Sequence, residues 1–254
     1  MPTPSLKELT SAYARIQVER VRATLERIIA RPSPVSSGRL IPVSSDIAIH
    51  DGRRIEATVL FLDICKFSNR PCETEEDQLL TMRILSLFFS EMIRIVEDFG
   101  GTVEKNTGDG LMAYFATSGP QGETIQQRAT ACALTMFFAA ENLINPIITH
   151  SKHPQLDFRI CMDHGNVTIA KVGAARRFNG IVAIGTTANI ASKMLSIAGP
   201  NQLLVGNAVI VGLPDSWVEN WARLETSNSG WVYESSGMSY PLWTYHGRWK
   251  VPQI

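Results

Sequence analysis

Several features are scarce in this chain of 254 residues, and each absence excludes a class of protein. Charged residues make up 19% of the sequence and the formal net charge is zero. A broad nucleic-acid-binding surface needs clustered excess Lys and Arg, so we expect no nucleic-acid partner. No run of about 18 uncharged apolar residues occurs, and no membrane span is expected. The polar N-terminus lacks the apolar core of a signal peptide, which favours a cytoplasmic protein.

Cysteine is scarce as well, with only Cys65, Cys72, Cys132 and Cys161 present. No two of them are spaced as a C-x-x-C pair, and three lie in apolar runs. We therefore interpret them as reduced, mostly buried thiols and not as metal ligands. Hydrophobic residues, by contrast, make up 44% of the chain, which is enough for the core of one large domain, with or without appendages.

The N-terminal segment is predicted to be separate from the rest. Ser5 and Glu8 form a capping box, and apolar residues recur at helical spacing through residues 5–31, which indicates an amphipathic helix. Such a helix either packs back on the domain or pairs with a second copy. Pro and Ser residues then break the pattern, so we expect a helix and linker at 1–38 and a large domain with a β-rich C-terminal extension at 39–254.

From residue 56 onward, the pattern predicts an α+β sandwich. A buried strand precedes a strongly apolar helix that ends at two glycines, a hairpin and a second long helix follow, and Asp163–Gly165 forms the turn of another strand pair. A short helix, a strand and a β-rich tail complete the chain. The order β-α-β-β-α-β is that of a ferredoxin-like fold. The expected ranges are 56–64, 78–99, 102–105, 111–115, 123–143, 156–162, 166–172, 187–198, 202–205 and 217–249.

Two aspartates, Asp63 and Asp109, stand at or just beyond the ends of apolar β-rich segments. An unpaired buried carboxylate is costly, so two such groups need a shared partner, and a divalent cation can be that partner. Carboxylate oxygens suit Mg²⁺ or Mn²⁺, ions that usually also hold substrate phosphates. The pair predicts a metal-dependent enzyme acting on a nucleoside triphosphate. Taken singly, each aspartate could instead cap a strand or form a turn.

Three segments carry a resemblance to a known family. They are Phe-Leu-Asp-Ile-Cys-Lys-Phe-Ser at 61–68, Gly-Thr-Val-Glu-Lys-Asn-Thr-Gly-Asp-Gly-Leu-Met-Ala-Tyr-Phe at 101–115, and Phe-Asn-Gly-Ile-Val-Ala-Ile-Gly-Thr-Thr-Ala-Asn-Ile-Ala-Ser-Lys at 178–193. Over about residues 56–212 the chain resembles the class III nucleotidyl cyclases. The resemblance implies a class III cyclase sandwich, a homodimer with two composite active sites, and two Mg²⁺ or Mn²⁺ ions in each. The implied reaction is attack of the ribose 3′-hydroxyl on the α-phosphorus, with pyrophosphate as leaving group.

The resemblance also implies roles for individual residues. Asp63 and Asp109 match the family's two metal-binding aspartates, and the Ile64 carbonyl is a further metal ligand. Lys105, four residues before Asp109, matches a residue that reads the base. Two such metal ions would activate the attacking hydroxyl and neutralise the leaving pyrophosphate.

The third segment supplies the residues implied to be catalytic. Asn189 matches the asparagine that positions the ribose, and Lys193 stands where the family usually has an arginine on the phosphates. One helical turn separates them, so they share a helix face. A lysine is a point charge and cannot make the planar bidentate contact of a guanidinium, so activity should survive in weakened form. The alternative for Lys193 is an ordinary solvated helix lysine.

The choice of base depends on Lys105 and Val182. Val182 stands seven residues before Asn189, where purine-selective members carry a second base-reading side chain. Valine has no acceptor for an exocyclic amine, and an unpaired buried donor costs about 1–3 kcal/mol. Lysine is a donor that suits a carbonyl oxygen. Uracil, with two carbonyls and no amine, therefore fits best, cytosine less well and guanine poorly.

A second resemblance, to a narrower group and carried by Ser68–Arg70 after the first segment, is to the pyrimidine cyclases of Pycsar anti-phage systems. It implies that UTP is the favoured substrate, that Arg70 contacts it, and that the product activates a separate effector which the cyclase does not contact directly. Adenylate or cytidylate cyclase activity is the alternative. A regulatory homologue that binds nucleotide without catalysis is a further alternative, although both aspartates and Asn189 are present. His164 is expected to be a turn residue and not a general base.

Overall fold

The computed structural model describes residues 35–37, 48, 51–106, 108–117, 122–150, 152–172, 181–225 and 230–249. The helix predicted at residues 5–31 lies outside this part of the chain. Within the predicted linker, Val35–Ser37 forms a short strand, β1, which pairs in parallel with the beginning of β2 (Gly52–Ile64). The division of the chain at residue 38 stays a prediction.

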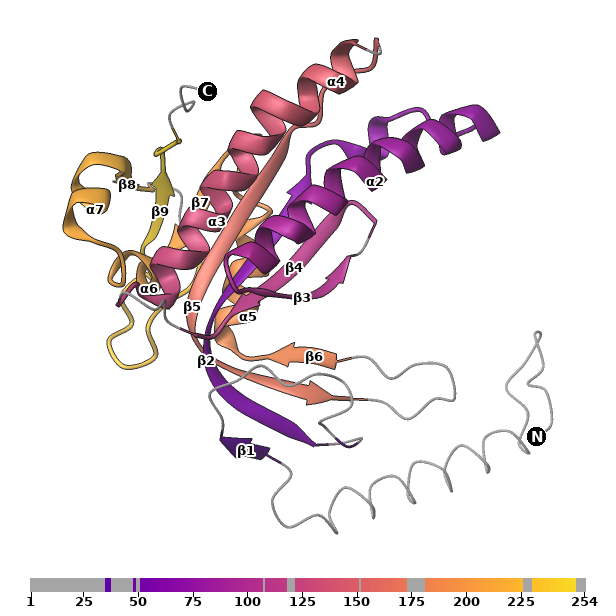
Figure 1. Ribbon diagram of the computed structural model, residues 1–254. Helices are drawn as coiled ribbons and strands as arrows, with labels where there is room; N and C mark the ends of the chain where they lie inside the picture. Colours follow the sequence, from indigo (N-terminus) through magenta and orange to yellow (C-terminus); the bar gives the residue numbers. More distant parts are fainter. Residues whose placement is uncertain are drawn as a thin grey trace, which may run out of the picture.

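In the described part of the chain, nine strands form one mixed sheet at the centre of the molecule (Figure 1). The strands follow the order β3-β4-β2-β5-β7-β9-β8, with β1 beside β2 and β6 beside β5. Together with the two long helices, the chain order β2-α2-β3-β4-α3-β5 confirms the predicted ferredoxin-like α+β sandwich. The remaining strands are β3 Thr102–Asn106, β4 Gly110–Phe115, β5 Phe158–Lys171, β6 Ile181–Ile184, β7 Leu203–Gly206, β8 Ala222–Leu224 and β9 Leu242–Tyr245.

The helices predicted at 78–99, 123–143 and 187–198 are all present, although the second continues to His150 and the third ends at Met194. The first long helix, α2 (Glu75–Asp98), starts three residues earlier than expected because Thr74 and Asp77 form a capping box. Gly100, with φ 71°, follows its C-terminal end. The other helices are η1 Phe67–Asn69, α3 Ile125–Ala139, the π-helical turn η2 Ala140–Ile144, α4 Asn145–His150, α5 Thr186–Met194, α6 Asn207–Ile210 and α7 Asp215–Trp221.

The continuous helical run Ile125–His150 is long and apolar enough to cross a membrane by length and composition alone. Half of its most apolar window is buried inside the protein, however, and α3 packs against β2 and β4. The run is apolar because it forms part of the core.

Two expectations from the sequence were wrong. The strand pair expected around Asp163–Gly165 is one continuous strand, β5, which pairs with β2 from Gly52↔Ala170 to Ile64↔Phe158. A turn at these residues would have interrupted the long antiparallel hydrogen-bond ladder between β2 and β5 at the centre of the sheet. The tail is also less β-rich than expected, since α7 occupies its beginning.

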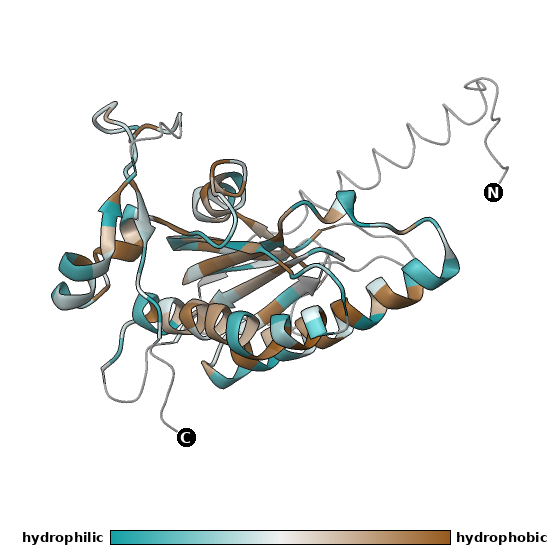
Figure 2. Cartoon of the chain, turned by 90° about the horizontal axis from the view of Figure 1, so that it is seen from above, coloured by the Kyte–Doolittle hydropathy of each residue, from teal (hydrophilic) through white to brown (hydrophobic). Residues whose placement is uncertain are grey.

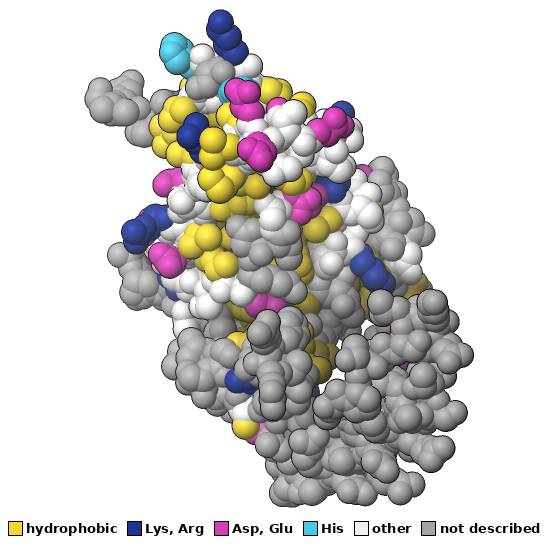
Figure 3. Space-filling view, turned by 90° about the vertical axis from the view of Figure 1, so that its right-hand side faces the viewer, with side chains coloured by type: hydrophobic (Ala, Val, Ile, Leu, Met, Phe, Trp, Pro, Cys, Tyr) yellow, Lys and Arg dark blue, Asp and Glu magenta, His cyan; other side chains and the backbone are white. Residues whose placement is uncertain are grey.

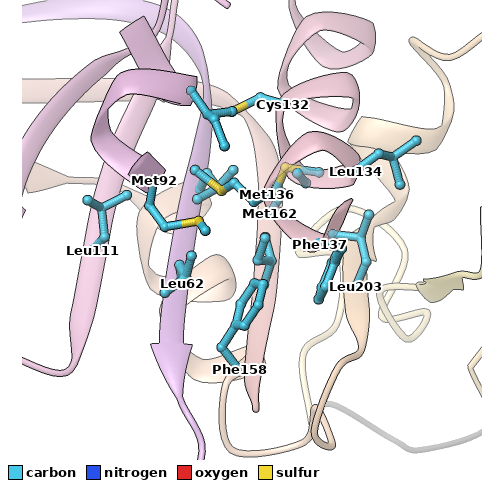
Figure 4. Close-up of a cluster of buried hydrophobic side chains, with 14 of the residues drawn as sticks. Leu62, Met92, Leu111, Cys132, Leu134, Met136, Phe137, Phe158, Met162 and Leu203 are labelled. Carbon is cyan, nitrogen blue, oxygen red and sulfur yellow. The ribbon is translucent and has the colours of Figure 1, made fainter. Parts of the chain in front are cut away.

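The sheet separates two hydrophobic clusters, because side chains alternate between the faces of a strand. Even-numbered residues of β2, such as Leu60 and Leu62, contact α2 and α3 on what we call the two-helix face. Odd-numbered residues, such as Ala57 and Val59, contact α5 on what we call the α5 face. Figure 2 shows the long helices and the short helix on opposite sides of the sheet, and Figure 4 shows Leu62, Met92 and Met136 meeting in the larger cluster.

Candidate active site

The two aspartates predicted to bind metal are brought together at one end of β2 and β4. The β2–β4 register pairs Asp63 with Gly110, and Asp109 is the residue directly before it. The backbone N–H of Ile64 donates a hydrogen bond of 2.9 Å to the carbonyl oxygen of Asp109. Antiparallel pairing thus places the backbones of all three predicted metal ligands side by side, although 46 positions separate the two aspartates in the numbering.

Arg159, which the sequence analysis did not single out, is the partner of Asp63. It lies directly opposite on β5, and its Nε and Nη2 both donate to Asp63 Oδ2, at 2.9 and 2.6 Å. Its Nη1 donates to the carbonyl oxygen of Ala198, just beyond α5, at 3.1 Å. The two side chains are 28% and 22% exposed. A lone cation in the apolar run Phe-Arg-Ile-Cys-Met was the signal that could have revealed it, since such a charge needs a partner.

The donor set at this strand end fits a hard divalent cation. Both contacts from Arg159 go to Oδ2 of Asp63, so Oδ1 takes part in neither. Two carboxylates and the Ile64 carbonyl are all oxygen donors, which Mg²⁺ and Mn²⁺ prefer. No three His, Cys, Asp or Glu side chains gather into a metal-binding group within the described residues. The protein would therefore supply part of the coordination, and substrate phosphates and water the rest.

The predicted base-reading residues lie on two separate strands. The backbone of Lys105 pairs with Met112 on β4, directly after a register irregularity in β3. Val182 lies on β6 and pairs with Ala170 of β5, near the end of β5 opposite to Arg159. Strand pairing within one chain does not bring these two positions together.

Asn189 and Lys193 lie on α5, and both side chains are exposed. The helix begins beside Gly165 and Val167, since a Cβ on Gly165 would lie 2.7 Å from the Thr187 hydroxyl. The β2 partner of Gly165 is Ala57, six residues before Asp63, which corresponds to roughly 20 Å along the strand. Asn189 lies two residues beyond Thr187 on α5, and its side chain is exposed.

Arg70 is held by backbone acceptors. Its Nη2 donates to the carbonyl oxygens of Pro154 and Gln155, at 3.0 and 2.6 Å, and partial burial lowers the pKa of its guanidinium. These contacts tie the end of η1 to the segment that enters β5. The predicted contact of Arg70 with substrate stays a prediction.

Asp163 and His164 lie in the middle of β5, so the expectation that His164 is a turn residue was wrong. The carboxyl of Asp163 is buried, and desolvation raises its pKa to about 7 despite a 2.7 Å hydrogen bond from the Tyr240 hydroxyl. His164 faces the other way, with Nδ1 3.0 Å from the Thr58 hydroxyl and Nε2 3.3 Å from Glu56. Burial lowers the pKa of His164.

Charges of both signs are mixed on the surface. Figure 3, which shows the side of the molecule at the right of Figure 1, has Lys and Arg scattered among Asp and Glu.

Comparison with known proteins identifies the family. The profile of the adenylate and guanylate cyclase catalytic domain matches residues 50–230, which is most of the chain. The chain belongs to this family. This match confirms the resemblance to the class III nucleotidyl cyclases that the three sequence segments showed.

Curated relatives of this cyclase domain include two proteins named uridylate cyclase. One, from Rhodovulum sp. (strain MB263), is 28% identical over 62% of this chain and 65%, just under two thirds, of its own length. The other, from Burkholderia cepacia, is 29% identical over 76% of this chain and 79% of its own length. Among solved structures, the guanylyl cyclase Cya2 superposes with a TM-score of 0.63 over 78% of this chain and 95% of its own, at 19% identity, which shows the shared fold.

The predicted residues thus fall into two groups on different elements of the cyclase fold. Asp63, Ile64 and Asp109 lie at one end of β2 and β4, with Arg159 bonded to Asp63. The exposed side of α5 carries the Asn189 amide and the Lys193 ammonium.

Proposed function

We propose that this domain is a uridylate cyclase, which converts UTP to 3′,5′-cyclic UMP and diphosphate. The observation that carries the proposal is the match to two curated uridylate cyclases, one of them over 76% of the chain. The chemistry of Val182 on β6 supports it, because an aliphatic side chain offers no acceptor to the exocyclic amine of adenine, guanine or cytosine. Uracil alone has no such amine.

The proposed active site is shared between two copies of the chain. Asp63, Asp109 and the Ile64 carbonyl of one subunit hold the metal ions and the triphosphate. Asn189 and Lys193 of the other subunit position the ribose and balance charge at the α-phosphorus. The exposure of Asn189 and Lys193 on α5 supports this arrangement, since both side chains are available to a second subunit. A symmetric dimer then contains two identical sites.

The chain's own residues would divide the work as follows. Arg159 orients the Asp63 carboxylate through two hydrogen bonds to one oxygen, which leaves the other directed to a cation. When bound, Mg²⁺ or Mn²⁺ ions lower the pKa of the 3′-hydroxyl and neutralise the leaving diphosphate. The Lys193 ammonium stabilises negative charge that grows on the phosphoryl oxygens. Lys105 donates to a carbonyl oxygen of the base.

The substrate is tested by incubating the purified protein with ATP, GTP, CTP or UTP, each with Mn²⁺, and separating the products. Cyclic UMP is expected as the dominant product. Cyclic AMP as the main product would overturn the uracil assignment and identify an adenylate cyclase, and cyclic CMP would identify a cytidylate cyclase. No cyclic product from any nucleotide would overturn the enzymatic function and favour a regulatory homologue.

The role of Val182 is tested by Val182→Thr, which keeps the side-chain shape and adds a hydroxyl acceptor. The ratio of ATP to UTP turnover is expected to rise by about tenfold, the value of one hydrogen bond of roughly 1.4 kcal/mol. Val172→Thr, the same change at an exposed position, is the matched control and should leave the ratio unchanged. An unchanged ratio in Val182→Thr would show that this side chain does not face the base.

The proposal includes an anti-phage role, in which cyclic UMP activates a separate effector protein. It rests on the resemblance of Ser68–Arg70 to the Pycsar cyclases. Cells that express the cyclase should accumulate cyclic UMP after phage infection, as measured by mass spectrometry of extracts. A constant level through infection would contradict this role without affecting the enzymatic assignment.

A further inference from the structure

A small hairpin, residues 231–240, lies between β8 and β9 and is built of short backbone contacts. The Tyr233 N–H donates to the Met238 carbonyl at 2.8 Å, and the Tyr240 N–H donates to the Trp231 carbonyl at the same distance. Val232 and Ser239 form a bridge between its two arms. We call this element the C-terminal hairpin.

Tyr240 anchors the C-terminal hairpin in the core. Its hydroxyl donates to the buried Asp163 carboxyl at 2.7 Å and accepts the backbone N–H of Ala208 at 3.1 Å. Gly206 leaves room for this pair, since a Cβ there would lie 2.2 Å from Asp163 Oδ1. The Tyr240 ring also packs edge-on against the Tyr233 ring, with centroids 5.3 Å apart. The base of the hairpin is therefore held by the central strand of the sheet.

Trp231, at the start of the hairpin, lies against α5. Its side chain is partly buried on the hydrophobic cluster that α5 shares with the sheet. The Lys193 Nζ lies 5.7 Å from the centroid of the Trp231 ring, within the range of a cation–π contact. Trp is the aromatic side chain that attracts a cation most strongly, so it favours one placement of the ammonium.

Lys193 needs such a support more than an arginine would. Its ammonium is a compact charge on a flexible four-carbon stem, whereas a guanidinium is planar and pre-organised. Ordering a free lysine costs rotamer entropy at the moment when charge must be stabilised. The backbone of Trp231 is bonded to Tyr240, which is itself bonded to Asp163 of the sheet. A Trp231 ring held in this way restricts the rotamers of Lys193 before the substrate binds.

We propose that Trp231 is a positioning residue, which holds the Lys193 ammonium where it meets the triphosphate. The proposal rests on the proposed function, because it assumes that Lys193 acts on the nucleotide. Trp231 itself touches the lysine and not the reacting atoms. The C-terminal hairpin then serves the reaction by presenting one ring to α5.

The contact is tested first without reference to activity. Lysines of the full-length protein are reductively methylated with ¹³C-formaldehyde, which keeps their charge, and the Lys193 signal is assigned by its absence in Lys193→Arg. A methyl group over an aromatic ring resonates upfield, and we expect this shift in the wild type and its loss in Trp231→Leu. Trp221→Leu, which removes an exposed Trp on α7, is the control and should leave the signal in place. The same Lys193 position in wild type and Trp231→Leu would overturn the proposal.

The functional consequence is tested by a double-mutant cycle on whichever nucleotide gives product. Trp231→Leu is expected to lower kcat about two- to fivefold, the size of an exposed cation–π contact, with a smaller change in KM. Trp231→Phe, which keeps an aromatic face, should retain most of the activity. In a Lys193→Met background, Trp231→Leu should cause no further loss.

The outcomes separate the two proposals. An equal loss from Trp231→Leu with and without Lys193 would overturn the positioning role while leaving the cyclase function intact. Cyclic AMP as product with coupling between the two residues would overturn the uridylate assignment and support the positioning role. No product from any nucleotide would overturn the proposed function and the positioning role together.

Discussion

One face of the central sheet is covered by α2 and α3, whereas the other carries the short α5 and the C-terminal hairpin (Figure 2). The cluster on the two-helix face holds large rings such as Phe88 and Phe158 in edge-to-face contact. On the α5 face, Asp63 and Arg159 lie opposite each other on neighbouring strands. The outer side of α5 on this face is exposed at Asn189 and Lys193. The comparison teaches that the large core lies under the two long helices, whereas the thinly covered α5 face is the one to which the proposed function assigns substrate and a second subunit.

The substitution with the largest expected effect is Asp63→Asn, which keeps the shape of the side chain and removes its negative charge from the α5 face. Turnover should fall by more than about 100-fold, beyond the effect of changing an outer-shell metal partner. The change also leaves Arg159 without its carboxylate, so metal binding should be measured directly, by Mn²⁺ titration monitored by electron paramagnetic resonance. Asp215→Asn, an exposed acid of α7, is the matched control. Retained turnover in Asp63→Asn would show that the metal assignment is wrong.

The open face is also expected to be shared between subunits. Asp63→Ala and Asn189→Ala should each be inactive alone, and mixing them should restore about a quarter of wild-type activity, since half the dimers carry one intact site of two. The measurement is cyclic product formation after the two variants are unfolded together and refolded. No recovery, with heterodimers confirmed by differently tagged chains, would contradict composite sites.

The two faces can be compared by one chemical change on each. Leu60 on β2 and Leu204 on β7 are both fully buried, the first in the two-helix cluster and the second in the α5 cluster. Replacing a buried leucine by alanine lowers the free energy of unfolding by about 2–5 kcal/mol, and the loss is larger where surrounding side chains cannot collapse. We expect Leu60→Ala to lose about 1 kcal/mol more than Leu204→Ala in urea denaturation. An equal loss would show that both faces are packed alike.

A pH-dependent effect is expected for Asp163, the buried acid of the α5 face. Burial raises its pKa from 3.8 to about 7 in the folded protein, so the folded state binds the proton more tightly than the unfolded state. Its contribution to stability is therefore complete below about pH 4 and is lost as the pH rises to about 7, with a slope of at most about 1.4 kcal/mol per pH unit. Asp163→Asn, measured by urea denaturation from pH 4 to 8, should remove this slope. The same slope in both proteins would assign the titration to other groups.

Much of the candidate site could be proposed from the sequence, because the residue types that suggest it stand at short spacing. Asp63 ends an apolar run and Asp109 stands in a Gly-Asp-Gly turn, so the sequence pattern predicts a carboxylate at a strand end in both places. Asn189 and Lys193 are one helical turn apart, which sets them on one face of α5 whatever the helix packs against. The order of strands and helices followed from hydrophobic periodicity for the same reason.

Long-range pairing could not be predicted in this way. Arg159 meets Asp63 only because β5 runs the full length of β2, and the expected turn at Asp163–Gly165 would have prevented that ladder. The local pattern contained a Gly in a polar triplet, which is typical of a turn, whereas cross-strand hydrogen bonds and burial keep the segment extended.

The sequence by itself thus determined the family, since the segments that identify it depend on residue types at short spacing. Only the tertiary structure decided which side chains meet: Arg159 against Asp63, Tyr240 against Asp163, and Trp231 against Lys193. Each of these pairs joins residues that are far apart in the chain. Their contacts depend on strand register and on the path of the C-terminal segment, which the burial of both sheet faces selects and no local pattern encodes.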